Sequence, residues 1–335
     1  MLERLSNAIG VSGGEHEVRK LLREAAAPYG EIHVDVMGNL YVHKQGDGPT
    51  IMACAHMDEV GMMIKGIMEN GMLAYSAVGV DPRVAISKRV LVGKDKIPGV
   101  IGAKAIHLQR GEERTSMPSH DNLFIDIGAK DKQEAMRFVK IGDYAGFDTT
   151  FAYFGENLMR GKALDDRVGC AAVLELLQRE YDCNFYGVFT VQEEVGLRGA
   201  MIAANYVKPD VALIFEGTTA NDMPGVEGHG HVTKVGNGPA LSVMDMGTIV
   251  KPKMLNALVQ AAEESGTPYQ YRQGTRGGTD GGSIHKAGLG AIVGGISVPC
   301  RYIHSPVSVA SVEDYKNVVR LADYFLANKR FEEVI

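Results

Sequence analysis

Residues 50–59 read Thr50-Ile-Met-Ala-Cys-Ala-His56-Met-Asp58-Glu59, an apolar run that ends abruptly in an imidazole and two carboxylates. A continuous apolar run of this length is typical of a strand that is buried on both faces of a sheet. In open α/β sheets, ligands bind beyond the carboxyl ends of the strands. The stretch therefore predicts a sheet covered by helices, with a polar site at the edge where the run ends.

Helix-like and strand-like segments alternate on both sides of this run. Before it, residues 12–27 show a helical pattern, and residues 32–36 and 40–42 alternate like a hairpin. After residue 162, helices are predicted at 164–179, 197–206, 252–265 and 312–326, and strands at 185–191, 211–215 and 291–298. This alternation predicts the α/β class, with a mostly parallel or mixed sheet sandwiched by helices.

The segment between these two regions has a different texture. Short strand-like pieces are broken by Gly, Pro, Asp and Asn, and they are expected at 62–68, 90–92, 99–107 and 123–127, with one short helix at 132–139. We therefore predict a small β-domain of residues 63–160. It is inserted into a discontinuous α/β domain of residues 1–62 and 161–335, which carries the polar site predicted after residue 56.

Charge and composition exclude several classes of protein. The chain has 35 Lys and Arg against 41 Asp and Glu, a net charge of −6, which disfavours binding to nucleic acid or to an anionic membrane. No apolar run approaches the ~20 residues of a membrane span, and the first residues lack the apolar core of a signal peptide. The four cysteines are widely spaced and are expected to be reduced, so the expected compartment is the cytoplasm.

Acids and imidazoles follow the predicted strands at the edge where ligands bind. They are His56 and Asp58, then Glu193 and Glu194, then Glu216, then His304, with Asp165 opening a helix. Each one alone has an ordinary structural explanation, such as a loop histidine or a helix N-cap. Together they would be costly without counter-ions, and divalent cations would remove that cost. The set therefore predicts a metal site.

The spacing of these residues suggests different roles. His56 and Asp58 are two apart, so in extended chain their side chains point the same way, and the Asp58 carboxylate can orient the imidazole. Glu193 and Glu194 are neighbours that face differently, so one can ligate a metal ion while the other acts as a base. The same adjacency disfavours a glycosidase, because its two carboxyl groups must lie on opposite sides of the bond that is cleaved. The chain also has no Trp that could form an aromatic platform for a sugar.

Several motifs identify a family that this chain resembles. They are Ala55-His-Met-Asp-Glu-Val-Gly61, Lys162-Ala-Leu-Asp-Asp-Arg167, Gln192-Glu-Glu-Val-Gly196, Gly277-Gly-Thr-Asp-Gly-Gly282 and Val298-Pro-Cys-Arg-Tyr-Ile-His-Ser-Pro306. They resemble the TET or glutamyl aminopeptidases, a family of co-catalytic dinuclear metallo-aminopeptidases that includes proteins once labelled endoglucanase. The matches run in order along nearly the whole chain.

The resemblance implies a zinc-peptidase type of fold whose inserted barrel-like domain serves dimerisation. It also implies two divalent ions, Zn²⁺ or Co²⁺, that hydrolyse short peptides at the N-terminal residue. The implied site has two catalytic residues, Glu193 as general base and Asp58 as the partner of His56. Its metal ligands are Asp165, which bridges, and the terminal ligands His56, Glu194, Glu216 and His304, and Asp280 has a weak substrate-binding role. Asp often replaces Glu216 in the family. The implied assembly is a homo-oligomer, often a tetrahedral dodecamer.

Other functions stay open at this point. An N-acyl amino-acid deacylase or a carboxypeptidase would use a related dinuclear scaffold, and a metal-binding protein without activity would not need Glu193. The preferred N-terminal residue is also open. Three basic residues near the expected pocket, Lys251, Arg272 and Arg276, would favour acidic side chains unless they are surface charges.

Overall fold

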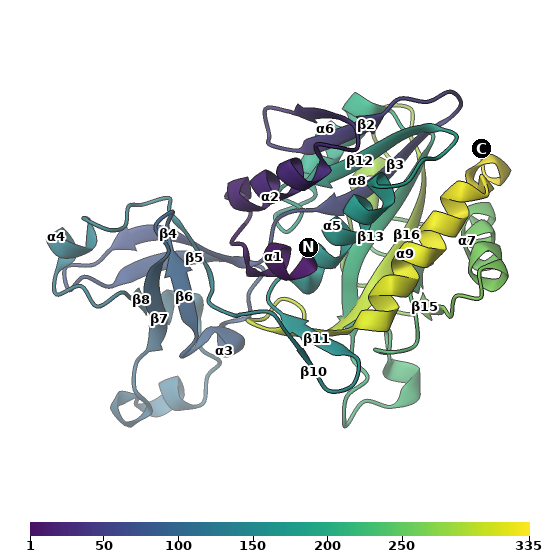
Figure 1. Ribbon diagram of the computed structural model, residues 1–335. Helices are drawn as coiled ribbons and strands as arrows, with labels where there is room; N and C mark the ends of the chain where they lie inside the picture. Colours follow the sequence, from purple (N-terminus) through teal and green to yellow (C-terminus); the bar gives the residue numbers. More distant parts are fainter.

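The computed structural model, which covers residues 1–335, consists of a large α/β body and a small barrel that projects from one side of it (Figure 1). The helices of the body are α1 (Leu2–Asn7), α2 (His16–Ala26), α5 (Leu164–Leu177), α6 (Arg198–Val207), α7 (Pro252–Glu264), α8 (Gly281–Ile284) and α9 (Val312–Ala327). No helix combines the length and the apolar character that a membrane crossing requires.

An 11-stranded mixed sheet forms the centre of the body. Its strands are β1 (Glu31–Val34), β2 (Leu40–Lys44), β3 (Thr50–His56), β10 (Ala152–Phe154), β11 (Leu158–Gly161), β12 (Asn184–Thr190), β13 (Val211–Ala220), β14 (Ala240–Ser242), β15 (Gln270–Arg272), β16 (Ile292–Arg301) and β17 (Ser308–Ser311). The four central strands β12, β3, β13 and β16 run parallel to one another. At their two sides, β2 pairs antiparallel with β12, and β17 pairs antiparallel with β16. The parallel strands therefore end at one common edge.

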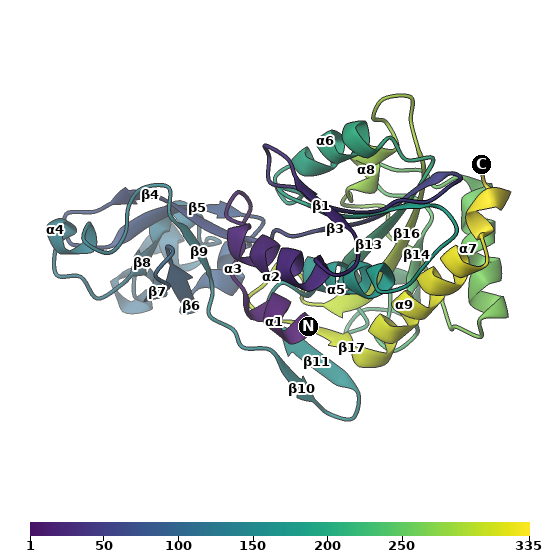
Figure 2. The ribbon, with the colours of Figure 1, turned by 45° about the horizontal axis from the view of Figure 1, so that its top comes forward.

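Strand β3 shows why the sheet is covered on both faces. Ile51, Ala53 and Ala55 belong to the main core cluster, which they share with α5 and α9. The alternate residues Met52 and Cys54 belong to a second cluster with α6. Figure 2 shows α6 and α8 on one face of the sheet and α2, α5 and α9 on the other. The predicted mixed α/β sheet sandwiched by helices is thus confirmed.

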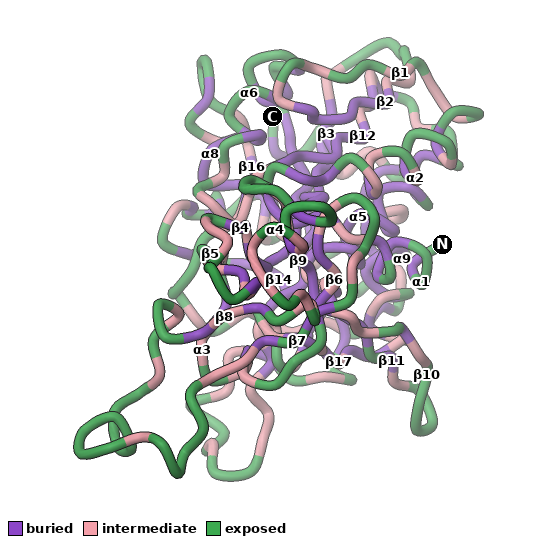
Figure 3. The backbone as a smooth tube through the Cα atoms, turned by 90° about the vertical axis from the view of Figure 1, so that its left-hand side faces the viewer, coloured by how far each residue is buried: buried purple, intermediate pink, exposed green.

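The barrel closes through the strand order β4-β5-β8-β7-β6-β9. The strands are β4 (Gly61–Ile67), β5 (Leu73–Val78), β6 (Arg89–Val92), β7 (Ile97–Ala103), β8 (Leu123–Asp126) and β9 (Tyr144–Phe147), with the short helices α3 (Pro82–Ala85) and α4 (Lys132–Ala135). A separate cluster of 16 buried residues fills it. Figure 3 faces this side and shows exposed connections around the buried strands. β10 and β11 lie between the barrel and residue 161 and belong to the large sheet, because β11 pairs with β17 and β10 with β11. The domain limits at 63 and 160 stay a prediction.

Some predicted element ends differ from the structure. The strand predicted at 211–215 is longer, because β13 pairs with β16 along all of its residues from Val211 to Ala220. Glu216 therefore lies inside a strand instead of following one. The strand predicted at 99–107 is β7, which ends at Ala103, and the helix predicted at 132–139 is α4, which ends at Ala135.

Candidate metal centre

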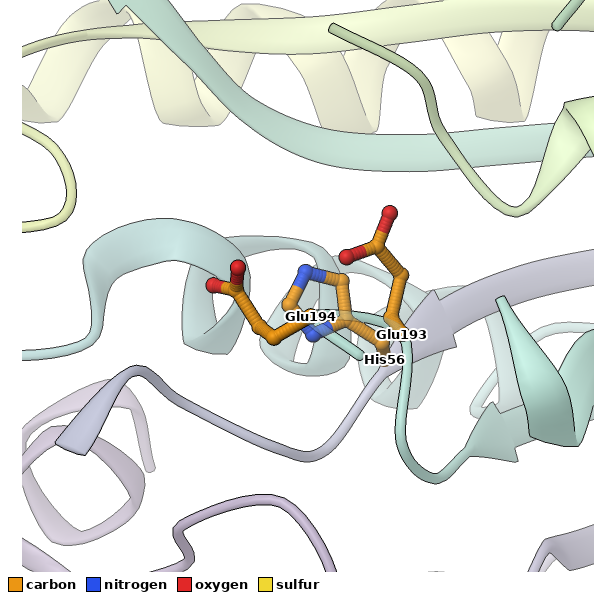
Figure 4. Close-up of side chains that lie close together, drawn as sticks. All are labelled: His56, Glu193 and Glu194. Atoms are coloured by element: carbon orange, nitrogen blue, oxygen red, sulfur yellow. The ribbon is translucent and has the colours of Figure 1, made fainter. Parts of the chain in front are cut away.

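Six of the predicted site residues lie in one cavity of about 910 Å³ at the common edge of the parallel strands. They are His56, Asp165, Glu193, Glu194, Glu216 and His304. His56 is the last residue of β3, and the two adjacent glutamates follow β12. Figure 4 shows the carboxylates of Glu193 and Glu194 close to the His56 ring. The fold thus brings together residues that are spread over most of the chain.

Asp165 lies between the two histidines of this cavity. Its Oδ1 is 3.2 Å from His56 Nε2, and its Oδ2 is 3.5 Å from His304 Nε2. Each histidine has one further carboxylate partner. His56 Nε2 is 3.5 Å from Glu216 Oε2, and His304 Nε2 is 3.4 Å from Glu194 Oε2. The five side chains therefore form two donor groups that share one carboxylate.

The donor set fits a pair of divalent cations. A tetrahedral ion with bonds near 2.0 Å keeps its ligand atoms about 3.3 Å apart, which matches the spacings around Asp165. The second oxygens of two carboxylates, Glu194 Oε1 and Glu216 Oε1, are buried without any hydrogen-bond partner. A buried oxygen of this kind is costly, and a cation satisfies it. Imidazole and carboxylate together are ligands typical of zinc and of similar metals.

Burial and mutual charge determine the proton affinities of these side chains. Burial raises the pKa of Glu194 to about 7 and that of Glu216 to about 8, and it raises the pKa of Glu193 well above its usual range. A hydrogen bond to Asp165 raises the pKa of His304 to about 9. Without cations, these residues therefore hold protons near neutral pH, and cations must displace them.

This electrostatic arrangement predicts a pH-dependent stability of the metal-free protein. Glu194, Glu216 and His304 all have pKa values raised above those of an unfolded chain, so the native state binds more protons than the unfolded state. Stability then falls as pH rises through about 7 to 9. After chelation, we expect Tm to drop by roughly 5 °C between pH 6 and pH 9.

The measurement is a thermal unfolding series in chelator, repeated with Zn²⁺ or Co²⁺ in excess. Bound cations replace the lost protons, so we expect the metal-loaded protein to show a much smaller drop over the same range. A metal-free Tm that rises from pH 6 to pH 9 would contradict the assignment of these charges.

Asp58 connects the segments that carry the candidate metal ligands through its buried carboxylate. Oδ1 is 3.4 Å from His56 Nδ1 and accepts a hydrogen bond from the Glu193 backbone N–H at 2.9 Å. Oδ2 accepts from the Glu194 N–H at 3.2 Å and from Ser12 Oγ at 2.5 Å. Asp58 thereby holds the turn that carries both glutamates, and its carboxylate lies beside the His56 ring.

Three residues that support the site were not predicted from the sequence. Ser12 contacts Asp58, and the Glu15 carboxylate accepts hydrogen bonds from the backbone N–H groups of Gln192, at 3.2 Å, and Gly13, at 2.7 Å. Asp166 accepts hydrogen bonds from the N–H groups of His56, at 3.2 Å, and Gly169, at 2.9 Å. The only sequence signal for Asp166 was its position next to Asp165 in the Lys162–Arg167 motif. Nothing in the sequence near Ser12 or Glu15 pointed to partners so distant in the chain.

The remaining candidates lie at different depths. Asp280 is 1% exposed and does not line the cavity; its Oδ2 accepts hydrogen bonds from Thr190 Oγ1 and Cys54 Sγ beneath the site. Arg272 and Arg276 do line the cavity. Lys251 lines a separate cavity elsewhere and is not part of the site.

Comparison with known proteins identifies the family to which the chain belongs. Residues 38–321 match the model of the M42 glutamyl aminopeptidase family. The structure of aminopeptidase APDkam598 from the archaeon Desulfurococcus kamchatkensis is 37% identical, with a TM-score of 0.93, over 97% of this chain and 93% of that one. A TET aminopeptidase from Thaumarchaeota archaeon SCGC AB-539-E09 is 35% identical, with a TM-score of 0.96, over 99% and 96%. Pyrococcus horikoshii TET1 peptidase is 31% identical, with a TM-score of 0.87, over 97% and 98%.

The fold, the site and these relatives define a hydrolase that acts on peptides, of the aminopeptidase class. The chain belongs to the M42 glutamyl aminopeptidase family, a metallopeptidase family. This result favours the aminopeptidase over the deacylase, the carboxypeptidase and the inactive metal-binding protein.

Proposed function

We propose that the chain removes N-terminal residues from short peptides with two divalent ions, Zn²⁺ or Co²⁺. His56, Glu216 and Asp165 would hold one ion, and Glu194, His304 and Asp165 the other. The observation that carries this proposal is the position of Asp165, whose two oxygens face different histidines at 3.2 Å and 3.5 Å. A carboxylate in that position suits a bridging ligand.

The chemistry divides between the ions and the protein. When bound, the ions would lower the pKa of water and polarise the scissile carbonyl. Glu193 is proposed as the general base that takes the proton of the water and passes it to the leaving amine. Its backbone N–H donates to Asp58, so the base has a fixed position.

The cavity also explains why cleavage would begin at a free N-terminus. The free α-amine would bind one of the ions or an acidic neighbour in the cavity, and an acylated terminus would do neither. The side chain of that residue would lie near Thr218, Ser242 and Arg272, which line the same cavity. Arg272 donates to Thr218 Oγ1 at 3.0 Å and to the Arg276 carbonyl at 2.7 Å, so its guanidinium is held in place.

We also propose self-association and a cytoplasmic location. The P. horikoshii TET1 peptidase assembles into a tetrahedron or a large octahedral shell, and a tetrahedral dodecamer is the assembly we propose for this chain. The four cysteines are all buried and free, which supports a reducing compartment.

Activity on unblocked and blocked peptides tests the proposal. We expect release of N-terminal residues from a panel of short peptides, loss of at least ~100-fold after chelation, and recovery with Zn²⁺ or Co²⁺. The same peptides with an acetylated N-terminus should stay intact. Cleavage of the acetylated peptides at a similar rate, or full activity in chelator, would contradict it. The panel also reports the preferred first residue.

A further inference from the structure

A second cavity, of about 800 Å³, lies between the barrel and the body. One wall is the connection from β5 to β6, which includes α3, and the other wall is the turn between β16 and β17. Figure 1 shows α3 on the side of the barrel that faces the body. A hollow of this size is large enough to hold a small ligand or a short peptide segment.

This cavity adjoins the metal centre. Tyr302, Ile303 and His304 line both cavities, so a single turn separates them. On the barrel side, a Cβ placed on Gly79 would lie 3.4 Å from Glu194 Oε2. The second cavity therefore begins beside two of the candidate metal ligands, His304 and Glu194, and Arg272 and Thr218 line only the first cavity.

One cation in this cavity has no counter-charge. Arg83 donates to Asp81 from Nε at 2.9 Å and from Nη2 at 2.6 Å, so these two charges neutralise each other. Lys88 is exposed and its ammonium makes no hydrogen bond or ion pair. Its backbone is fixed, because its N–H donates to the Ala85 carbonyl at 3.1 Å and its carbonyl accepts from the Ile101 N–H at 2.9 Å.

We propose that this second cavity holds the part of the peptide that follows the scissile bond, and that Lys88 attracts its C-terminal carboxylate. The inference rests on the proposed function, since the first cavity then takes the N-terminal residue and the rest of the substrate must extend past His304. Apolar side chains of Val84, Ile86 and Pro306 on the walls suit the side chains of the departing peptide. In a short peptide the C-terminal carboxylate lies within reach of Lys88, whereas in a long chain it lies far from the second cavity. Lys88 therefore favours short substrates.

Three substrates with the same preferred first residue test this inference: a tripeptide with a free carboxylate, its C-terminal amide, and an aminoacyl arylamide. For the wild-type protein we expect kcat/KM to favour the free tripeptide over the amide by about two- to fivefold, the range of one exposed ion pair. Lys88→Met should remove this preference and Lys88→Glu should reverse it. Added salt should weaken it in the wild-type protein.

The control is Lys94→Met, which removes another exposed barrel lysine that lies outside the cavity. It should leave all three rates unchanged. Activity on the arylamide depends on the proposed function alone and should be equal in all four proteins. An unchanged preference in Lys88→Met, or an equal loss on all three substrates, would overturn the role of Lys88.

Discussion

Glu193→Gln is expected to lower kcat by about 10²- to 10⁴-fold, the usual contribution of a positioned general base. Glutamine keeps the size of the side chain and one oxygen, but it cannot accept a proton from water and return it to the leaving amine. Glu193 is not needed for either donor group around Asp165, so the variant should still bind two metal ions per chain.

The measurement combines steady-state kinetics with the metal content of the purified protein. Glu194→Gln is the matched comparison, because it changes the neighbouring residue in the same turn but removes a ligand of the second group. It should lower metal content as well as activity. Full activity in Glu193→Gln, or a loss of metal equal to that in Glu194→Gln, would contradict the role of Glu193.

Asp165→Asn is expected to have the largest effect on metal binding, with activity reduced by more than about 10³-fold, since it removes the charge shared by both donor groups. The neutral amide retains only one carbonyl oxygen as a ligand. It therefore cannot bind both the ion beside His56 and the ion beside His304. We expect the variant to contain fewer than one tightly bound ion per chain after dialysis, as measured by elemental analysis.

Asp166→Asn serves as the control for this change. Asp166 accepts hydrogen bonds from the backbone N–H groups of His56 and Gly169, so we assign it to positioning the end of β3 and the start of α5. Asparagine preserves part of this contact, and metal content should fall much less than in Asp165→Asn. The opposite order of metal losses would assign the bridge to Asp166, whose carboxylate also lies within reach of His56 and Glu216.

A strand could be predicted from the sequence where burial on both faces requires an apolar residue at every position. β3 begins and ends at the predicted residues, 50 and 56, because every position between is apolar and the run stops at the polar site. The limits of β13 were not predictable in this way. Glu216, Thr218 and Thr219 are polar, yet they belong to the strand because their backbones pair with β16. Their polar side chains line the cavity.

For the candidate site, the residues at strand ends were predictable and their supports were not. His56 and Glu194 follow apolar runs, which marks them in the sequence. Ser12 and Glu15 support the same site from a segment before α2, and only the folded chain shows their contacts with Asp58 and Gln192. Asp280 lies near the strand ends, but its burial below the cavity floor depends on packing that spacing does not reveal.

The most direct test of the account is anomalous diffraction from crystals of the protein grown with Zn²⁺ or Co²⁺, recorded at the absorption edge of the metal. We predict two peaks per chain, one enclosed by His56, Glu216 and Asp165, and the other by Asp165, Glu194 and His304. Peaks confined to other parts of the molecule, or a single peak that does not touch Asp165, would contradict the shared-carboxylate centre.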